Sequence, residues 1–389
     1  MIRMRTPTIP PTSLKPRVTF VITSLFKGGA ETQLVRLAAG MADRGWPVKI
    51  VTLMDLNDFV NVLGERDIQV ESLGIPRGRY DPLSLPRLVR ILRRQKPEIV
   101  CTFMYHANVL GRVAARMAGV PTVVSSIRNA MFGGRIADRL MAMTDRLATL
   151  TTTNSELAAK ALLERRVARP ERLTVIRNAV DLSPPGTVEE SRDELIGSTL
   201  GSSWLWFSVG RLEPQKAHEV TIKALARLRA EGVDAHLAIA GAGALKDELL
   251  ELCSALGLSG NVSMLDYRKD IGALMAVSDG LVLASRWEGL PNAILEACVA
   301  GLPVVATSVG GVTEIIEHER TGFVVRPDDV GALADAMRRL MELSPAERGK
   351  MAGAAREYVE STFEPQAVTD VWEGVFNELL KDRRRVRRT

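Results

Sequence analysis

Two cations follow an apolar run in the segment 208–218, which reads S-V-G-R-L-E-P-Q-K-A-H. The run that precedes them, 205–210, is typical of a buried strand. A strand there would deliver Arg211 and Lys216 to the same edge of a sheet. A guanidinium fork and an ammonium point charge at one edge can together neutralise a diphosphate. Taken alone, the segment is also compatible with two ordinary surface cations.

A second segment, 285–307, places two carboxylates around a predicted helix start. It follows the strand-like run 280–285, and Pro291 suits the first turn of a helix. Glu288 would then lie in the loop before the helix and Glu296 about one turn into it. Ionised carboxylates accept hydrogen bonds from vicinal hydroxyl groups, and the backbone N–H groups of a helix start suit a phosphate. Two solvent-exposed glutamates are the alternative interpretation.

Weaker signals come from glycines and from one histidine. Gly28 and Gly29, in the loop 24–33 after the first predicted strand, allow a ligand to approach the backbone closely. Neither that loop nor G-A-G-A at 241–244 matches G-x-G-x-x-G, so a nicotinamide-dependent enzyme is disfavoured. His106 begins a predicted helix, although a lone histidine is more often structural. No histidine pairs with another at metal-ligand spacing, so we expect no metal site and no cofactor.

Both halves of the chain alternate short apolar runs with helical patterns. Buried strands separated by helices are typical of a parallel sheet in a doubly wound α/β domain. We therefore expect an α/β protein with two facing Rossmann-like domains, joined near the Pro-, Gly- and Ser-rich stretch 183–203, with ligands in the cleft between them. The predicted strands are 18–23, 48–53, 99–103, 122–126, 148–153 and 173–176, then 205–210, 235–240, 262–265, 280–285, 303–307 and 323–325.

Composition narrows the class of protein. The chain has 389 residues, of which 46% are hydrophobic and 25% charged, as in a globular protein of about two domains. Its apolar runs, such as 297–305, are far shorter than the ~20 residues that span a bilayer, and the basic, Pro-rich residues 1–17 lack the apolar core of a signal peptide. Cys101, Cys253 and Cys298 form no C-x-x-C pair, which fits a reducing cytoplasm.

Charge is distributed unevenly along the chain. Residues 1–181 carry a net charge of +13, residues 182–380 carry −13 and residues 381–389 carry +5. A basic half next to an acidic half indicates different partners for each. The basic half favours an anionic partner such as a membrane surface, a lipid phosphate or nucleic acid.

The segment 77–96 is especially rich in arginine. Arg87, Arg90 and Arg94 fall at helical spacing, with apolar residues on the other side, which predicts a basic amphipathic helix lying on a membrane. The solvated face of an ordinary surface helix is the alternative. The C-terminal R-R-R-V-R-R is a second candidate contact with a membrane or nucleic acid, although terminal basic tails are often only solubilising.

These segments together resemble a known family. E-G-L-P-N-A-I-L-E-A, residues 288–297, is similar to the E-x7-E motif of retaining glycosyltransferases of family 4, which have the GT-B fold. V-G-R-L-E-P-Q-K is similar to the diphosphate-binding strand end of that family. Residues 28–48 look like its first loop and helix, and V-I-R-N-A-V-D at 175–181 resembles its domain-closing segment. The match spans almost the whole chain, and its combination of two glutamates with two cations is highly specific.

The resemblance implies a domain plan. Residues 1–182 would form an N-terminal acceptor-binding domain and residues 183–365 a C-terminal nucleotide-sugar-binding domain. Residues 366–389 would form a C-terminal helix that crosses back to the first domain, followed by the basic tail. Two departures from the family pattern affect loop detail: Ala217 and Ala179 stand where the family usually has glycine.

The resemblance also implies roles for single residues. Arg211 and Lys216 would neutralise the diphosphate that leaves in the reaction, Glu296 would bind the nucleotide ribose, and Glu288 would contact the hydroxyl groups of the donor sugar. L-D-Y-R at 265–268 would frame the base. The implied catalytic residues are His106, Arg211, Lys216 and Glu288, and the implied donor-binding residues are Gly29, Asn178, Asp266, Tyr267, Arg268, Gly289, Leu290, Pro291, Asn292 and Glu296.

M-Y-H-A-N-V-L-G-R at 104–112 and S-S-I-R-N at 125–129 resemble members that extend glycans on polyprenyl-diphosphate carriers at the cytoplasmic membrane face. The acceptor-binding residues would then be Gly28, Asn108, Arg112 and Arg128. The expected partners are a nucleotide diphosphate sugar, with UDP favoured over GDP, a lipid-linked or polysaccharide acceptor, and an anionic membrane surface contacted by the basic N-terminal domain. No nucleic acid is expected, because no aromatic platform accompanies the basic half.

The activity predicted is therefore a retaining, metal-independent hexosyltransferase of cell-envelope glycan synthesis, peripheral to the inner face of the cytoplasmic membrane. Two alternatives stay open. A sugar-nucleotide epimerase on the same fold would need further acid and base groups beside the sugar. A non-catalytic nucleotide-sugar-binding scaffold at the membrane would bind a donor without turning it over, although the intact set of glutamates and cations argues against such a loss of activity.

Overall fold

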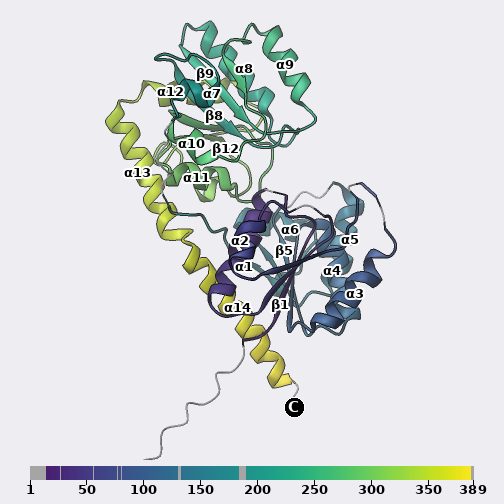
Figure 1. Cartoon of the computed structure of the whole chain (residues 1–389). Helices are drawn as coiled ribbons and strands as arrows, with labels where there is room; N and C mark the ends of the chain where they lie inside the picture. The colour runs from purple at the N-terminus through teal and green to yellow at the C-terminus, as the bar shows by residue number, and fades with distance from the viewer. Residues whose placement is uncertain are drawn as a thin grey trace, which may run out of the picture. The chain divides into compact units, whose positions relative to one another are not determined.

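The structure is a computed structural model that describes residues 15–26, 28–55, 57–76, 78–79, 81–129, 133–183 and 190–386. Within these residues the chain forms two parallel β-sheets, each covered by helices (Figure 1). The alternation of buried strands and helices in the sequence predicts this arrangement, and the α/β fold class with two Rossmann-like sheets is confirmed.

The first sheet has seven strands in the order β3-β2-β1-β4-β5-β6-β7. β1, β4 and β5 are buried along their whole length, as expected for inner strands of a parallel sheet. β3 escapes prediction because its residues, Q-V-E-S, are mostly polar and at least partly exposed at the sheet edge. The strands are β1 (Val18–Ile22), β2 (Val48–Thr52), β3 (Gln69–Ser72), β4 (Ile99–Phe103), β5 (Thr122–Ile127), β6 (Leu150–Thr153) and β7 (Leu173–Val175). The helices are α1 (Gly29–Asp43), α2 (Val60–Gly64), α3 (Ser84–Gln95), α4 (Tyr105–Met117), α5 (Arg135–Asp145), α6 (Glu156–Glu164) and the 3₁₀ turn η1 (Pro170–Arg172).

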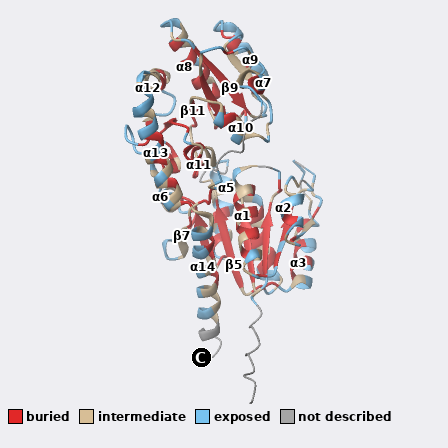
Figure 2. Cartoon of the chain, turned by 60° about the vertical axis from the view of Figure 1, so that its left-hand side comes forward, coloured by how far each residue is buried: buried red, intermediate tan, exposed pale blue. Residues whose placement is uncertain are grey.

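The second sheet has six strands in the order β10-β9-β8-β11-β12-β13. Alternate residues of β8 enter different cores: Leu205 and Phe207 pack on one face of the sheet and Trp206 on the other. Figure 2 shows these strands as buried ribbons between partly exposed helices. The strands are β8 (Trp204–Val209), β9 (Ala235–Ala240), β10 (Val262–Met264), β11 (Gly280–Leu283), β12 (Val304–Thr307) and β13 (Phe323–Val325). The helices are α7 (Arg192–Ile196), α8 (His218–Ala230), α9 (Lys246–Ala255), α10 (Ile271–Ala276), α11 (Asn292–Val299), η2 (Gly310–Glu314), α12 (Val330–Glu342), α13 (Pro345–Thr362) and α14 (Pro365–Val386).

Helix α3 corrects one prediction. The sequence predicts that its apolar side lies on a membrane, but Leu88, Ile91 and Leu92 are buried in the hydrophobic core beside the first sheet. An apolar face that is already packed cannot also enter a bilayer. The exposed arginines of α3 form the solvated face of an ordinary helix, and two of them are paired, Arg87 with Asp81 and Arg94 with Glu71.

The residues group into two compact units. One contains the residues up to Ser125, Leu147–Thr149 and the residues from Phe376 onward, and the other contains Ser126–Arg146 and Leu150–Val375. The division therefore passes through the first sheet. Of the predicted linker 183–203, residues 184–189 lie outside the described part of the chain.

Helix α14 contributes to both units. In the first unit the ring of Phe376 lies 6.0 Å from the ring of Trp46. In the second, the Arg128 guanidinium lies 5.9 Å from the ring of Trp372. The side chains of the basic tail from residue 384 onward lie outside the description. No helix in the described part of the chain is both long and apolar enough to cross a bilayer.

Candidate functional site

The loops that follow β8, β9 and β10 are held together by backbone hydrogen bonds. The Gly210 N–H donates to the Ala240 carbonyl at 3.0 Å, and the Gly241 N–H donates to the Asp266 carbonyl at 2.7 Å. A Cβ at Gly241 would lie 1.9 Å from the Gly210 carbonyl oxygen, so only glycine permits this approach. The G-A-G-A segment thus supports the loop that carries Arg211 and Lys216.

Lys216, in the loop after β8, and Glu288, in the loop after β11, form an ion pair. The Lys216 Nζ lies 2.5 Å from the Glu288 Oε1, and the Ser285 hydroxyl donates to the same oxygen at 2.7 Å. The Lys216 and Glu288 side chains are only 15% and 8% exposed. A charge-assisted contact between two nearly buried groups fixes both in position. The ion pair therefore joins one residue of the 208–218 segment to one residue of the 285–307 segment.

Arg211 is the accessible cation of the site. Its side chain is 62% exposed and pairs with Glu213 at 2.7 Å. It also donates to the side-chain oxygen of Gln215 at 3.0 Å, and Gln215 in turn donates to the Trp287 carbonyl at 2.9 Å. This chain of contacts links the 208–218 loop to the 285–307 loop. A guanidinium held in this way can still turn toward an anion in solvent.

His218 was not predicted as a site residue, yet it lies beneath the cationic loop. It is buried, and its Nδ1 lies 3.4 Å from the Ser208 Oγ. Burial, together with the nearby charge of Lys216, lowers the pKa of His218 to about 4, so its imidazole is neutral at pH 7. Its Nε2 has no hydrogen-bond partner among the described residues. The position two residues after Lys216 is the signal in the sequence that could have revealed it.

Asn178 connects the start of α11 to residues that follow strands of the first sheet. Its amide nitrogen donates to the Leu290 carbonyl at 3.0 Å and to the Asn292 Oδ1 at 2.7 Å. Its oxygen accepts from the Arg128 Nη1 at 2.9 Å. Asn178 is 3% exposed. This burial argues against its predicted direct contact with the donor and favours a role in fixing the helix start.

Gly289 and its neighbours are equally constrained. A Cβ at Gly289 would lie 2.2 Å from the Arg128 carbonyl oxygen, which leaves room only for glycine. Leu290 and Pro291 are buried, whereas Asn292 and Glu296 are partly exposed. Of the predicted donor-binding residues around α11, Asn292 and Glu296 have the accessible side chains. The others shape the backbone that carries them.

The residues predicted to frame a base follow β10. Asp266 is 60% exposed in its side chain and pairs with Lys246 at 2.5 Å, and Tyr267 is 37% exposed. Arg268 is held by Asp270, so its side chain is already committed to a local ion pair. Asp266 and Tyr267 thus have accessible side chains, and Arg268 supports the turn.

The predicted residues of the first unit divide into accessible and buried ones. Gly29 begins α1 and His106 is the second residue of α4, and both are exposed, while Gly28 is partly exposed. Asn108 and Arg112 are fully buried. The Arg112 Nε donates to the Ser125 hydroxyl at 2.8 Å, and that hydroxyl donates to Asn108 at 2.9 Å.

A buried guanidinium in this network ties α4 to β5. The burial argues against the prediction that Asn108 and Arg112 bind the acceptor, and it leaves Gly28, Gly29 and His106 as accessible candidates. Arg128, the remaining predicted acceptor residue, is only partly buried but is engaged by Asn178.

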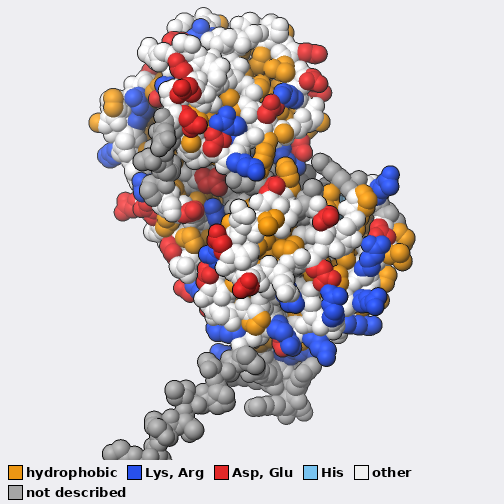
Figure 3. All heavy atoms as spheres, viewed as in Figure 1, with side chains coloured by type: hydrophobic (Ala, Val, Ile, Leu, Met, Phe, Trp, Pro, Cys, Tyr) orange, Lys and Arg blue, Asp and Glu red, His pale blue; other side chains and the backbone are white. Residues whose placement is uncertain are grey.

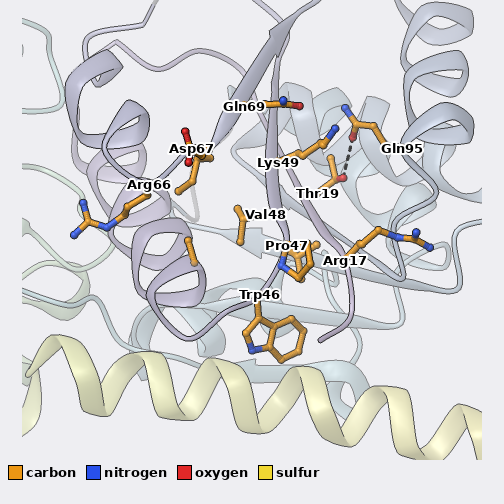
Figure 4. Close-up of a pocket in the computed structure, with 13 residues that line it drawn as sticks. Arg17, Thr19, Trp46, Pro47, Val48, Lys49, Arg66, Asp67, Gln69 and Gln95 are labelled. Atoms are coloured by element: carbon orange, nitrogen blue, oxygen red, sulfur yellow. Dashed lines mark hydrogen bonds between the residues drawn. The ribbon is translucent and has the colours of Figure 1, made fainter. Parts of the chain in front are cut away.

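A separate opening of about 360 Å³ lies at the amino ends of β1, β2 and β3. Figure 4 shows its lining, with Trp46 facing α14 and Thr19 hydrogen-bonded to Gln95 at 2.9 Å. Ligands of parallel sheets bind at the carboxyl ends of the strands, so this opening is distinct from the candidate site. In the described residues, no three His, Cys, Asp or Glu side chains gather closely enough to hold a metal ion.

Two Rossmann-like parallel sheets in one chain are the arrangement of the GT-B class of fold. The chain superposes with a TM-score of 0.82 on Anabaena HepE in complex with UDP-glucose, at 23% identity, covering 93% of this chain and 100% of that one. It superposes with a TM-score of 0.81 on sucrose-phosphate synthase from Thermosynechococcus elongatus, at 19% identity, covering 94% and 100%. These likenesses confirm the predicted fold.

Sequence comparison defines the family within that fold. The profile described as Glycosyltransferase Family 4 matches residues 27–184, and the profile described as Glycosyl transferases group 1 matches residues 198–358. The chain is 30% identical over 279 residues to UDP-Gal:alpha-D-GlcNAc-diphosphoundecaprenol alpha-1,3-galactosyltransferase of Escherichia coli, covering 67% of this chain and 71% of that one. The chain therefore belongs to glycosyltransferase family 4, as the motifs predict.

A further relative matches a shorter part of the chain. Alpha-D-kanosaminyltransferase of Streptomyces kanamyceticus is 34% identical over 173 residues, which covers 44% of this chain and 45% of that one.

Proposed function

We propose that this glycosyltransferase is a retaining, metal-independent hexosyltransferase that uses a nucleotide diphosphate sugar, with UDP as the nucleotide. The observation that carries the proposal is the Lys216–Glu288 pair at 2.5 Å beside the accessible Arg211. Cations for a diphosphate and a carboxylate for sugar hydroxyl groups are thereby adjacent. The E. coli relative is named for a UDP-linked donor, and HepE is solved with UDP-glucose, which supports the same donor class here.

In the proposed reaction, the anomeric carbon of the donor sugar loses its bond to the diphosphate and gains one to an acceptor hydroxyl oxygen. The hydroxyl proton passes to the departing diphosphate. Negative charge grows on the diphosphate as the bond breaks. Lys216, which is held at the site, and Arg211, which can turn toward the anion, would stabilise that charge. The departing diphosphate directs the acceptor to the face that it leaves, so the configuration at the anomeric carbon is retained.

Separate parts of the chain would hold the two substrates. Residues 183–365 would bind the donor, with Glu288 accepting hydrogen bonds from the sugar and Glu296 from the ribose. Residues 1–182 would bind the acceptor through Gly28, Gly29 and His106, and residues 366–389 would close the chain back onto them. We further propose a lipid-linked or polysaccharide acceptor of envelope glycan synthesis at the inner membrane face. The E. coli relative, whose name specifies a diphosphoundecaprenol acceptor, supports this choice.

The test is nucleotide release from a panel of UDP- and GDP-sugars, with and without a bacterial polyprenyl-diphosphate lipid fraction. The wild type is compared with Glu288→Gln and with Glu251→Gln, which changes an exposed glutamate of α9. We expect release with one donor in the presence of the lipid, a loss of roughly 10²–10³ in Glu288→Gln and no change in the control.

The outcomes separate the alternatives. Donor binding without release under any acceptor would favour a non-catalytic scaffold. Isomerised donor recovered without released nucleotide would favour an epimerase. The anomeric configuration of the product, determined by NMR, decides between retention and inversion.

A further inference from the structure

Helix α5, Arg135–Asp145, presents an exposed face made only of apolar and cationic side chains. Three large apolar residues on it are open to solvent: Ile136 is 77% exposed, Leu140 41% and Met143 69%. The exposed residues from the start of the helix to its C-cap are Arg135, Ile136, Arg139, Leu140, Met143 and Arg146. In the described residues, none of these three arginines has an ion-pair partner.

The acidic residues of α5 face the protein and are engaged by other side chains there. Asp145 is buried and accepts a hydrogen bond from Thr151 at 2.5 Å. Asp138 forms an ion pair with Arg165. Met141 on the same side is fully buried. The helix is therefore anchored through one side and leaves no exposed carboxylate on the other.

The exposed residues are also ordered around the helix axis. At about 100° per residue, Ile136, Leu140 and Met143 fall within a sector of about 60°, and the three arginines fall within an adjacent sector of about 40°. An apolar band flanked by cations is the pattern of a helix that lies in a bilayer interface, with arginine side chains extending to the lipid phosphates. In Figure 3, apolar and cationic side chains, with some acidic ones, lie on the right-hand side of the view, where Figure 1 places α3, α4 and α5.

We propose that α5 is the membrane-docking element of this enzyme, inserting Ile136, Leu140 and Met143 at the surface of an anionic bilayer. This inference names the partner surface of the proposed function and rests on it for its biological purpose. Charge complementarity favours an anionic membrane as the partner, because the three exposed arginines match anionic lipid headgroups. A second copy of this face would offer those arginines no carboxylate. Helix α3, in contrast, has its apolar side already buried.

The test is co-sedimentation of the full chain with vesicles of phosphatidylcholine alone and with about 30 mol% phosphatidylglycerol added. The triple variant Ile136→Ser/Leu140→Ser/Met143→Ser should lose roughly tenfold or more in affinity for the anionic vesicles. Arg135→Gln/Arg139→Gln/Arg146→Gln should lose about a hundredfold, at about fivefold per arginine, and with it the preference for anionic lipid. All substituted residues are exposed, so circular dichroism should show unchanged folding.

Matched controls keep the inference falsifiable. Leu250→Ser removes a 44% exposed leucine from α9, and Arg90→Gln removes an exposed arginine from α3, and neither should lower vesicle affinity by more than about twofold. Wild-type binding by the α5 apolar variant would overturn the proposal. An equal loss in Arg90→Gln and in the single variant Arg139→Gln, which should lose about fivefold, would also overturn it. Loss of a dimer in sedimentation velocity, with vesicle binding unchanged, would assign the face to self-association instead.

UDP affinity measured by calorimetry on the same variants separates this inference from the proposed function. Unchanged UDP binding together with lost vesicle binding supports the docking role. A wild type that binds UDP but no vesicles overturns the docking role and leaves the transferase proposal standing. A wild type that binds vesicles but no UDP contradicts the proposed donor and leaves α5 as the docking element.

Discussion

After the strands of the second sheet, the side chains suited to chemistry are charged and paired, and one of them, Arg211, is well exposed. After the strands of the first sheet, two of the predicted site residues, Asn108 and Arg112, are buried by packing. Lys216 and Glu288 form an ion pair, and their side chains keep a small exposed fraction. Asn108 and Arg112, in contrast, are wholly buried in a hydrogen-bond network with Ser125. The exposed residues Gly29 and His106 remain for a ligand. The presence of a polar residue in a motif therefore does not by itself show that the folded chain leaves its side chain accessible to a ligand.

The sharpest test of this contrast is Lys216→Ala. We expect kcat to fall by roughly 10²–10³, because the charge that stabilises the leaving diphosphate is lost. The substitution also leaves the Glu288 carboxylate without its cation, so stability should fall too. Adding Glu288→Gln should restore much of the stability, measured by denaturant unfolding, and none of the rate.

Lys223→Ala, at an exposed position of α8, is the control and should change neither quantity. A full rate in Lys216→Ala would contradict the assignment of the second sheet to leaving-group stabilisation.

Acid should destabilise the second sheet through two buried histidines. Burial is the main cause that lowers the pKa of both His218 and His236 to about 4, aided by Lys216 for His218 and by Arg192 for His236. The unfolded chain binds protons near pH 6.5, so this stability is complete above pH 6.5 and is lost as the pH falls toward 4. Each histidine should account for a loss on the order of 3 kcal/mol.

Urea unfolding between pH 7 and pH 4 measures this loss. His236→Gln should flatten the profile. An equally steep profile in His236→Gln would show that other groups dominate the acid response.

Arg112→Ala tests the first sheet. Removing a buried side chain and its bond to Ser125 should lower the free energy of unfolding by about 2–3 kcal/mol, with UDP affinity unchanged. Arg93→Ala, at an exposed position of α3, should cost less than about 0.5 kcal/mol. If Arg112→Ala instead raised the KM for the acceptor at unchanged stability, Arg112 would contact the acceptor after all.

The smallest expected effect is at Gly241. A Cβ there meets the Gly210 carbonyl oxygen, so Gly241→Ala should cost about 1–3 kcal/mol and displace the cationic loop. Gly260→Ala places its Cβ in open space and should be nearly neutral. Thermal unfolding of the two variants gives the comparison, and equal melting temperatures would show that the loop can relax.

Sequence patterns predict those features that depend on periodicity and on charge at strand ends. The strands buried on both faces were recognisable as apolar runs, and the 208–218 and 285–307 segments indicated a shared edge. Burial of particular polar residues was not predictable, because Arg112 and Asn178 become internal only through contacts from distant segments. The apolar side of α3 and that of α5 look alike in sequence, and only the tertiary structure shows which one is covered.

The Asn178 amide has a consequence for building hybrid enzymes from this family. It joins Arg128, Leu290 and Asn292, so the α11 start is fastened partly by residues encoded far upstream of it. A chimera spliced at 183–203, taking its front half from a relative, would exchange Arg128 and Asn178, which support the start of α11, along with the proposed acceptor-binding residues. Such a hybrid needs the matching asparagine, arginine and glycine positions transplanted together, or the start of α11 will lose the hydrogen bonds that hold it.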